Sequence, residues 1–210
     1  MTSTHYRKRT AEDWTNSLIS DDFNIVGTLK FHNGRSISRN TALTLVSAYW
    51  HKVDKVFFGK AADKGYGIER WCFSEYGADG DNLHIHFIAQ APVATLPTCA
   101  ILNALWVNFN RSTASYHNNW ITPITHKRKA IAYTVKGTRL QNTDPINENA
   151  SHTNALGTHI NNFDTDAQIR RISNRLSAAQ LLTAQHALNR HIQETELRMA
   201  RRSQQAQQKR

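Results

Sequence analysis

Two histidines separated by one residue stand in the apolar stretch 82–89 (NLHIHFIA). Side chains alternate between the two faces of a β-strand, so His84 and His86 would share one face while Ile85 points to the other. Two neighbouring imidazoles on one face could bind a metal ion. With 11 histidines in 210 residues, chance gives such a pair in roughly half of similar sequences. A pair of surface histidines is therefore the alternative.

A glutamate can be placed beside this pair by the turn that precedes it. If Asp79-Gly80 forms the centre of a type I′ hairpin turn, counting outward sets Glu75 opposite His84. Directly opposed residues have Cβ atoms about 4.5 to 5.5 Å apart, so Glu75, His84 and His86 could share one ion. A slip of one residue would turn Glu75 away, and Asp79 or Asp81 would then be the substitutes.

Two imidazoles and one carboxylate leave coordination positions open, which is typical of a catalytic rather than a structural metal site. Oxygen-rich substrates such as phosphates could occupy these positions, and Mn²⁺ or Mg²⁺ would suit a phosphoryl substrate. A non-haem Fe(II) oxygenase uses the same donor types. The segment 87–92 (FIAQAP) lacks the glutamate that a cupin-like oxygenase would carry after the histidines, so that alternative is the weaker one.

A tyrosine and a lysine form the third element, in the sequence Tyr133-Thr134-Val135-Lys136. On a helix, Tyr133 and Lys136 would share a face, while Ile131 and Val135 would turn toward the sheet. A phenol has a pKa of about 10 and needs an activated electrophile at neutral pH. A metal ion polarising a phosphate and a lysine offsetting its charge would supply this activation. Taken alone, Tyr133 could equally be a half-buried packing residue.

The charge of the chain indicates a polyanionic partner. It has 26 Lys and Arg against 16 Asp and Glu, a net charge of +10, so nucleic acid is the first candidate. The stretch 126–139 contains no acid and five basic residues, which are Lys127, Arg128, Lys129, Lys136 and Arg139. Trp120 and Tyr116 could stack on unpaired bases or belong to the core.

Composition excludes several other classes. Hydrophobic residues make up 40% of the chain, as in a globular protein. Two cysteines are too few for a disulfide framework and fit a reducing cytoplasm. We expect no export signal and no membrane span, because no long apolar run occurs. Gly59-Lys60-Ala61 lacks the other residues of a phosphate-binding loop, so no nucleotide-driven motor is expected.

Hydrophobic periodicity predicts an α+β fold, an antiparallel-centred sheet with helices on one face. A polar linker or loop is expected at 141–165. A basic helical region should follow at 166–210, ending in a disordered tail at 201–210. A helix is predicted along the apolar stripe from Leu43 to Phe57, with Ser38 or Asn40 as N-cap. Further helices are predicted at 96–109 and 127–136, and strands at 23–31, 68–76, 82–89 and 119–124.

This order of motifs resembles that of the HUH endonucleases. An apolar opening strand comes first, then a glutamate before His-hydrophobe-His, then Tyr-x-x-Lys. The chain is most similar to the single-tyrosine rolling-circle replication initiators of plasmids, small single-stranded DNA viruses or filamentous phages. The resemblance covers about Phe23 to Gly137. It implies an RRM-like or ferredoxin-like nuclease domain within residues 1–140.

The resemblance also implies roles for individual residues. His84 and His86 would hold a divalent ion with Glu75 as third ligand, and Tyr133 would attack a DNA phosphodiester with help from Lys136. The products would be a 5′-phosphotyrosine link and a free 3′-hydroxyl. The residues expected to contact DNA are Thr28, Lys30, Lys127, Arg128, Lys129 and Arg139.

The expected partner is single-stranded DNA at an origin or hairpin, and no membrane is involved. Because the motif has one tyrosine, repeated cleavage and joining would reuse Tyr133 or need a second protomer in a homodimer. Since no helicase domain is evident, strand separation would fall to host replication proteins. A relaxase or single-tyrosine transposase, with Tyr6 as its nucleophile, and a non-catalytic basic nucleic-acid-binding protein are the alternatives.

Overall fold

The computed structural model describes residues 3–77, 80–110, 119–137, 145–153 and 165–208. At its centre is an antiparallel sheet with the strand order β2-β3-β1-β4. Its strands are β1 (Ile25–Lys30), β2 (Arg70–Glu75), β3 (His84–Ala89) and β4 (Trp120–Pro123). The chain is therefore α+β, and each strand lies within the range that hydrophobic alternation predicts.

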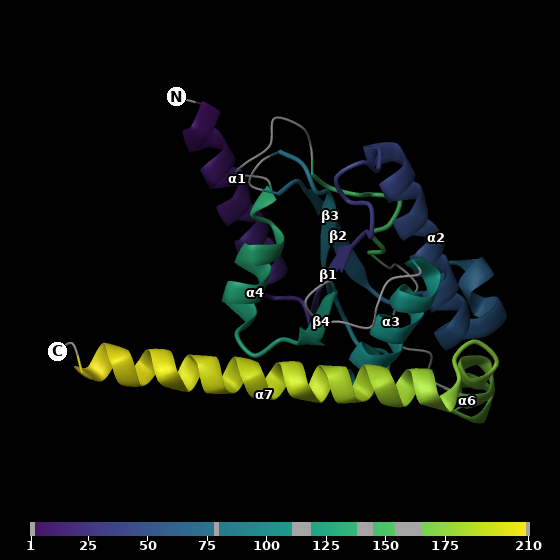
Figure 1. The fold of residues 1–210 in the computed structure, drawn as a ribbon. Coiled ribbons are helices and arrows are strands. Elements are labelled where there is room, and N and C mark those ends of the chain that lie inside the picture. The colour runs from purple at the N-terminus through teal and green to yellow at the C-terminus, as the bar shows by residue number, and fades with distance from the viewer. Residues whose placement is uncertain (1–2, 78–79, 111–118, 138–144, 154–164, 209–210) are drawn as a thin grey trace.

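The larger core lies on the sheet face covered by α2 (Arg39–Phe58) and α3 (Thr95–Asn110) (Figure 1). Inward-facing strand residues such as Leu29, Ile85 and Phe87 pack there against Trp50 and Trp106. The predicted N-cap is resolved in favour of Ser38, whose hydroxyl accepts from the Thr41 amide at 3.1 Å. A short 3₁₀ helix, η1 (Gly59–Lys64), follows α2.

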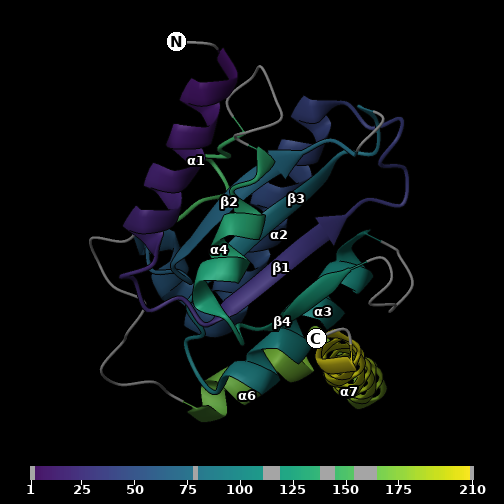
Figure 2. The ribbon, with the colours of Figure 1, turned by 90° about the vertical axis from the view of Figure 1, so that its left-hand side faces the viewer.

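Helices cover the opposite face as well, so the prediction of helices on one face only is wrong. α1 (Ser3–Leu18) and α4 (Lys127–Thr134) lie across this second face (Figure 2). Their apolar residues form a second core with Val26, Phe73 and Ile88 from the strands. All six residues of β3 are buried, and a strand buried on both faces needs a cover on each.

α1 has no counterpart among the predicted elements. Most of its residues are polar, and few apolar positions, among them the buried Ala11 and Leu18, contact the rest of the molecule. α1 packs against α4, so it holds in place the helix that carries Tyr133.

The C-terminal region forms two helices, α6 (Thr165–Ser173) and the long α7 (Ala178–Gln208). α7 packs against α3 and β4. The predicted disordered tail is wrong for residues 201–208, which continue α7, because arginine, alanine and glutamine favour a helix that has already begun. No helix in the described ranges is long and apolar enough to cross a membrane.

Part of the predicted polar linker is docked onto the sheet. Residues 145–153 run beside β2 through the bridges Arg70 to His152 and Phe73 to Ile146. Ala150 is fully buried in the larger core. Backbone hydrogen bonds from residues 145–153 pair with the N–H and C=O groups on the outer edge of β2. Without them, this edge would expose unpaired backbone groups.

A buried ion pair joins this segment to the core. Arg70 Nη2 lies 3.0 Å from Asp54 Oδ2, and Arg70 Nη1 donates to Asp54 Oδ1 at 3.0 Å. The guanidinium also stacks 4.5 Å from the Trp50 ring centroid, and its Nε donates to the Ala150 carbonyl at 2.7 Å. Asp54 and Arg70 thus tie α2, β2 and the docked segment together.

Candidate active site

The register of the hairpin sets Glu75 directly opposite His84, as the sequence predicts. His86 pairs with Phe73 on one side and Thr28 on the other. Because β1, β2 and β3 are in antiparallel register, these residues share the sheet face that α4 crosses.

The loop that produces this register is not the predicted two-residue turn. Gly80 N donates to the Gly77 carbonyl, and Gly77 N donates to the Asp81 carbonyl. Gly77 thus pairs with Asp81, whereas the register of β2 and β3 would set it opposite Asn82. Gly80 and Asn82 have positive φ values of 75° and 58°. Beyond the loop, β2 and β3 pair with Glu75 opposite His84. Asp79 lies outside the described residues.

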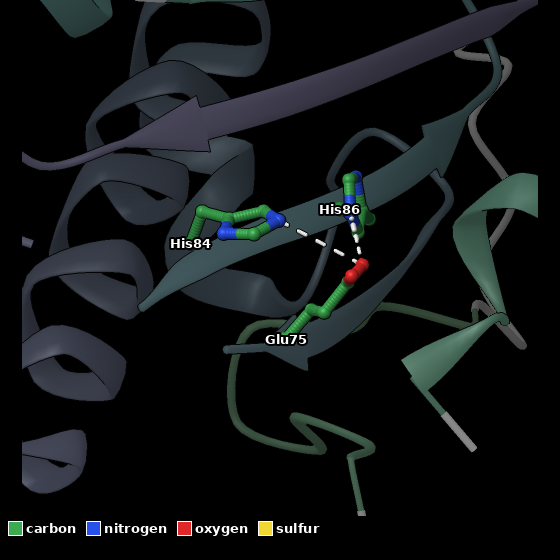
Figure 3. A group of neighbouring side chains, drawn as sticks. All are labelled: Glu75, His84 and His86. Carbon is green, nitrogen blue, oxygen red and sulfur yellow. Dashed lines mark hydrogen bonds and ion pairs between the residues drawn. The ribbon is translucent and has the colours of Figure 1, made fainter. Parts of the chain in front are cut away.

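Glu75, His84 and His86 point toward one another from β2 and β3 (Figure 3). His86 Nε2 lies 2.6 Å from Glu75 Oε2, and His84 Nε2 lies 3.7 Å from the same oxygen. One potential ligand atom from each residue lies within 4.8 Å of the others, and all three side chains are buried. This group could hold a metal ion.

The hydrogen bonds behind the histidines fit metal binding. His84 Nδ1 lies 3.0 Å from the Asn82 carbonyl, which can only accept, so Nδ1 carries the proton and neutral His84 keeps a lone pair on Nε2. That lone pair faces a carboxylate oxygen, an arrangement that a cation between them would stabilise. His86 Nδ1 lies 2.9 Å from Thr28 Oγ1, a hydroxyl that can either donate or accept. Outer partners of this kind orient metal-ligating histidines.

The electrostatics of the group favour the protonation states that a metal requires. Burial lowers the pKa of His86 to about 4, although its hydrogen bond with Glu75 opposes the shift. For Glu75 burial raises the pKa, but the neighbouring imidazoles of His84 and His86 and the charge of Lys136 outweigh it, leaving the pKa well below its usual range. Near neutral pH His86 is therefore uncharged and Glu75 ionised, as ligands must be.

Tyr133 and Lys136 stand directly over this group, on and just after α4. The Tyr133 ring lies edge-on to His86, with centroids 4.9 Å apart, and 42% of Tyr133 is exposed. Lys136 Nζ lies 3.2 Å from Glu75 Oε1 and 3.9 Å from the centre of the Tyr133 ring. Ile131 and Val135 are fully buried against the sheet, as the helical pattern predicts.

Gly137 lets the end of α4 approach β2 at this point. A Cβ atom there would lie 2.9 Å from the Ser74 carbonyl oxygen. Only glycine permits this close approach of the two backbones, which brings Lys136 to Glu75.

Trp120 borders the tyrosine on the other side. Its ring meets Tyr133 edge-on at 5.9 Å, and its indole nitrogen donates to His191 Nε2 of α7. The sequence suggested Trp120 only as a stacking or core residue, and it gave no sign of His191. A long helix more than 50 positions further along the chain reaches the site only through tertiary packing.

The residues expected to bind DNA fall into different positions. Thr28 is 4% exposed and its hydroxyl contacts His86, so it orients that imidazole instead of facing solvent. Lys30 is half-buried on β1 and pairs in register with His84. Lys127 donates to the Asp21 carbonyl.

Arg128 and Lys129 are exposed on α4 and line an open hollow with Lys127 and His126. Arg139 and Tyr116 lie outside the described residues. Asp81, the substitute ligand, instead pairs with Arg35 at 3.4 Å. Six of the predicted site residues therefore meet at one place: Glu75, His84, His86, Tyr133, Lys136 and, behind His86, Thr28.

No family model, curated protein or solved structure matches this chain. Its function therefore has to be inferred from the geometry described above.

Proposed function

We propose that this protein is a metal-dependent endonuclease of the HUH type. It would nick and rejoin single-stranded DNA through a covalent phosphotyrosine intermediate and thereby start rolling-circle replication. The observation that carries the proposal is an exposed tyrosine lying against the buried His86 of the Glu75, His84 and His86 group, with a lysine contacting both the tyrosine and Glu75.

The ligands Glu75, His84 and His86 would hold a divalent ion, Mn²⁺ or Mg²⁺. Imidazole nitrogens suit Mn²⁺ better than the harder Mg²⁺, which prefers oxygen, so Mn²⁺ is expected to support higher activity. When bound, the ion would polarise the scissile phosphate and stabilise the charge that develops on it.

Tyr133 would supply the nucleophile. Its phenol oxygen attacks phosphorus, the bond from phosphorus to the 3′ oxygen breaks, and a 5′-phosphotyrosine and a free 3′-hydroxyl result. The phenol releases its proton to solvent, and the departing oxygen takes one up. One phosphate ester replaces another, so the reverse attack by a 3′-hydroxyl can rejoin the strand.

Lys136 would offset the negative charge near the tyrosine oxygen. In the structure its ammonium group is held between Glu75 and the Tyr133 ring. A cation fixed in advance beside the nucleophile would stabilise the negative charge that develops on the phosphate, and needs no reorganisation during the reaction.

The deciding experiment is a search for a covalent adduct. Purified protein is incubated with a pool of labelled single-stranded oligonucleotides and Mn²⁺ and run on a denaturing gel. We expect a protein-DNA adduct that disappears in EDTA and in Tyr133→Phe. The matched control is Tyr6→Phe, which should form the adduct like the wild type.

Other outcomes would change the assignment. An adduct lost in Tyr6→Phe and kept in Tyr133→Phe would indicate the relaxase arrangement. DNA binding that is unaffected by EDTA, with no adduct from any oligonucleotide, would indicate a non-catalytic binding protein.

A further inference from the structure

The C-terminal half of α7 projects past the sheet on the side where α4 and the active site lie (Figure 1). Viewed from that side, α7 points toward the reader next to β4 (Figure 2). Its first half is anchored through the buried Ala184 and Leu188, whereas residues 196–207 are all exposed. This projecting half, residues 196–207, therefore lies along the β4 edge of the site.

One face of α7 runs from the active site along this projecting half. His191 accepts a hydrogen bond from Trp120, whose ring lies against Tyr133. At 100° per residue, Arg198 and Arg202 lie within about 20° of the direction of His191. A rise of 1.5 Å per residue puts them about 10 and 16 Å further along the axis. Both arginines therefore continue the face that contacts Trp120.

The charge of this segment suits a polyanion. Residues 197–208 include three arginines and no acid. Within the described chain, no acidic side chain lies within ion-pairing distance of Arg198 or Arg202. Leu197 and Met199, 60% and 41% exposed, lie on other sides of the helix and are the feature that a second copy of the chain would cover.

We infer that this face of α7 binds the backbone of the single-stranded DNA that enters the site, an inference that rests on the proposed function. Arg198 and Arg202 contact successive phosphates, and Trp120 stacks on a base next to His191, where the projecting half begins. A basic track next to an aromatic platform is how proteins bind unpaired strands without reading their sequence.

The test compares two double variants with the same loss of charge. Arg198→Ala with Arg202→Ala removes the inferred contacts. Arg190→Ala with Arg201→Ala removes two exposed arginines that point about 80 to 100° away from the direction of His191. Both are made in Tyr133→Phe and assayed in EDTA. The probe is a labelled oligothymidine of about 20 nucleotides, whose anisotropy is followed at several salt concentrations.

We expect the first double variant to bind about tenfold more weakly, with a salt slope reduced by about 1.4, or 0.7 for each lost phosphate contact. The control should change affinity less than about twofold. Equal losses in both variants would overturn the inference, because charge would then act diffusely. A larger loss on duplex DNA than on oligothymidine would overturn it too.

A different result would assign the face to a second copy of the chain instead. In that case the Arg198 and Arg202 variant would bind DNA like the wild type, and sedimentation would show a dimer for the wild type but a monomer for the variant. Because the assay needs no cleavage, its result is independent of the adduct experiment. If binding of oligothymidine requires Arg198 and Arg202 but no adduct forms, the inference about the α7 face would stand and the proposed nuclease function would be wrong.

Discussion

Thr28 shows how one hydroxyl can orient a residue of the candidate metal group without belonging to that group. It lies between Trp120 and His86 in the register of the sheet, and it is 4% exposed. Its contact with His86 Nδ1 fixes the rotation of the ring and so directs Nε2 toward Glu75. Thr28 is therefore a positioning residue, whereas the sequence resemblance suggested a DNA contact.

Replacing Thr28 with valine should weaken Mn²⁺ binding. The substitution keeps the β-branched shape but removes the hydroxyl, and losing an outer partner of a ligating histidine typically costs about 10- to 100-fold in metal affinity. Isothermal titration of the folded variant with Mn²⁺ measures this. Thr28→Ser, which keeps the hydroxyl, is the control; equal weakening in Thr28→Ser and Thr28→Val would assign the effect to packing.

The elements depend on contacts between segments that are distant in the chain. α2, β2 and residues 145–153 meet at the Arg70–Asp54 pair, which is nearly inaccessible to water. A second pair, Lys55 with Asp63, joins α2 to η1 at the surface. The two pairs use the same helix but differ in burial.

Asp54→Asn should therefore destabilise the fold strongly. It leaves the Arg70 charge buried without a counterion, a loss of about 3 to 5 kcal/mol. Asp63→Asn, at the solvent-exposed pair, should cost much less, because water screens that interaction. Urea unfolding followed by circular dichroism measures both; similar losses in the two variants would contradict the burial argument.

The whole molecule should become less stable in acid because of its buried histidine. The unfolded chain binds a proton at His86 near pH 6.5, whereas burial lowers the pKa of His86 in the fold to about 4. Between these values the unfolded state holds more protons, so the free energy of unfolding falls as the pH falls. The window is pH 6.5 to 4, and the expected fall is about 2 to 3 kcal/mol.

Urea unfolding in EDTA across this range checks the prediction, since EDTA removes any contribution from a bound metal. His86→Gln should flatten the dependence, because it removes the titrating group. His126→Gln, at an exposed position, should keep the wild-type slope. A His86→Gln protein with an unchanged slope would show that other groups control the acid response.

At the same scale, helices from both ends of the described chain meet near the Glu75, His84 and His86 group. α1 supports α4, and α7 reaches β4. β4, α4 and the C-terminal helix α7 thus meet at Trp120, His191 and Tyr133. For this reason the surface that we infer to bind DNA includes residues from the far end of the sequence.

Local patterns alone predicted much of this protein. Alternation and helical spacing identified the four strands and α2, α3 and α4. They also put His84 and His86 on one face and brought Tyr133 next to Lys136, because these relations depend on backbone geometry over a few residues. Even the pairing of Glu75 with His84 followed from counting outward from a turn, although the backbone hydrogen bonds of that loop differ from those of the predicted turn.

Other features were decided only by the tertiary structure. The position of Thr28 behind His86, the contact of His191 with Trp120, and the docking of residues 145–153 on β2 join segments that are distant in the sequence. Such contacts depend on how complete faces pack, and no local period encodes that. The cover of α1 and α4 over the second face belongs to the same class: burial on both sides of β3 demands it, but only the packed molecule shows which helices provide it.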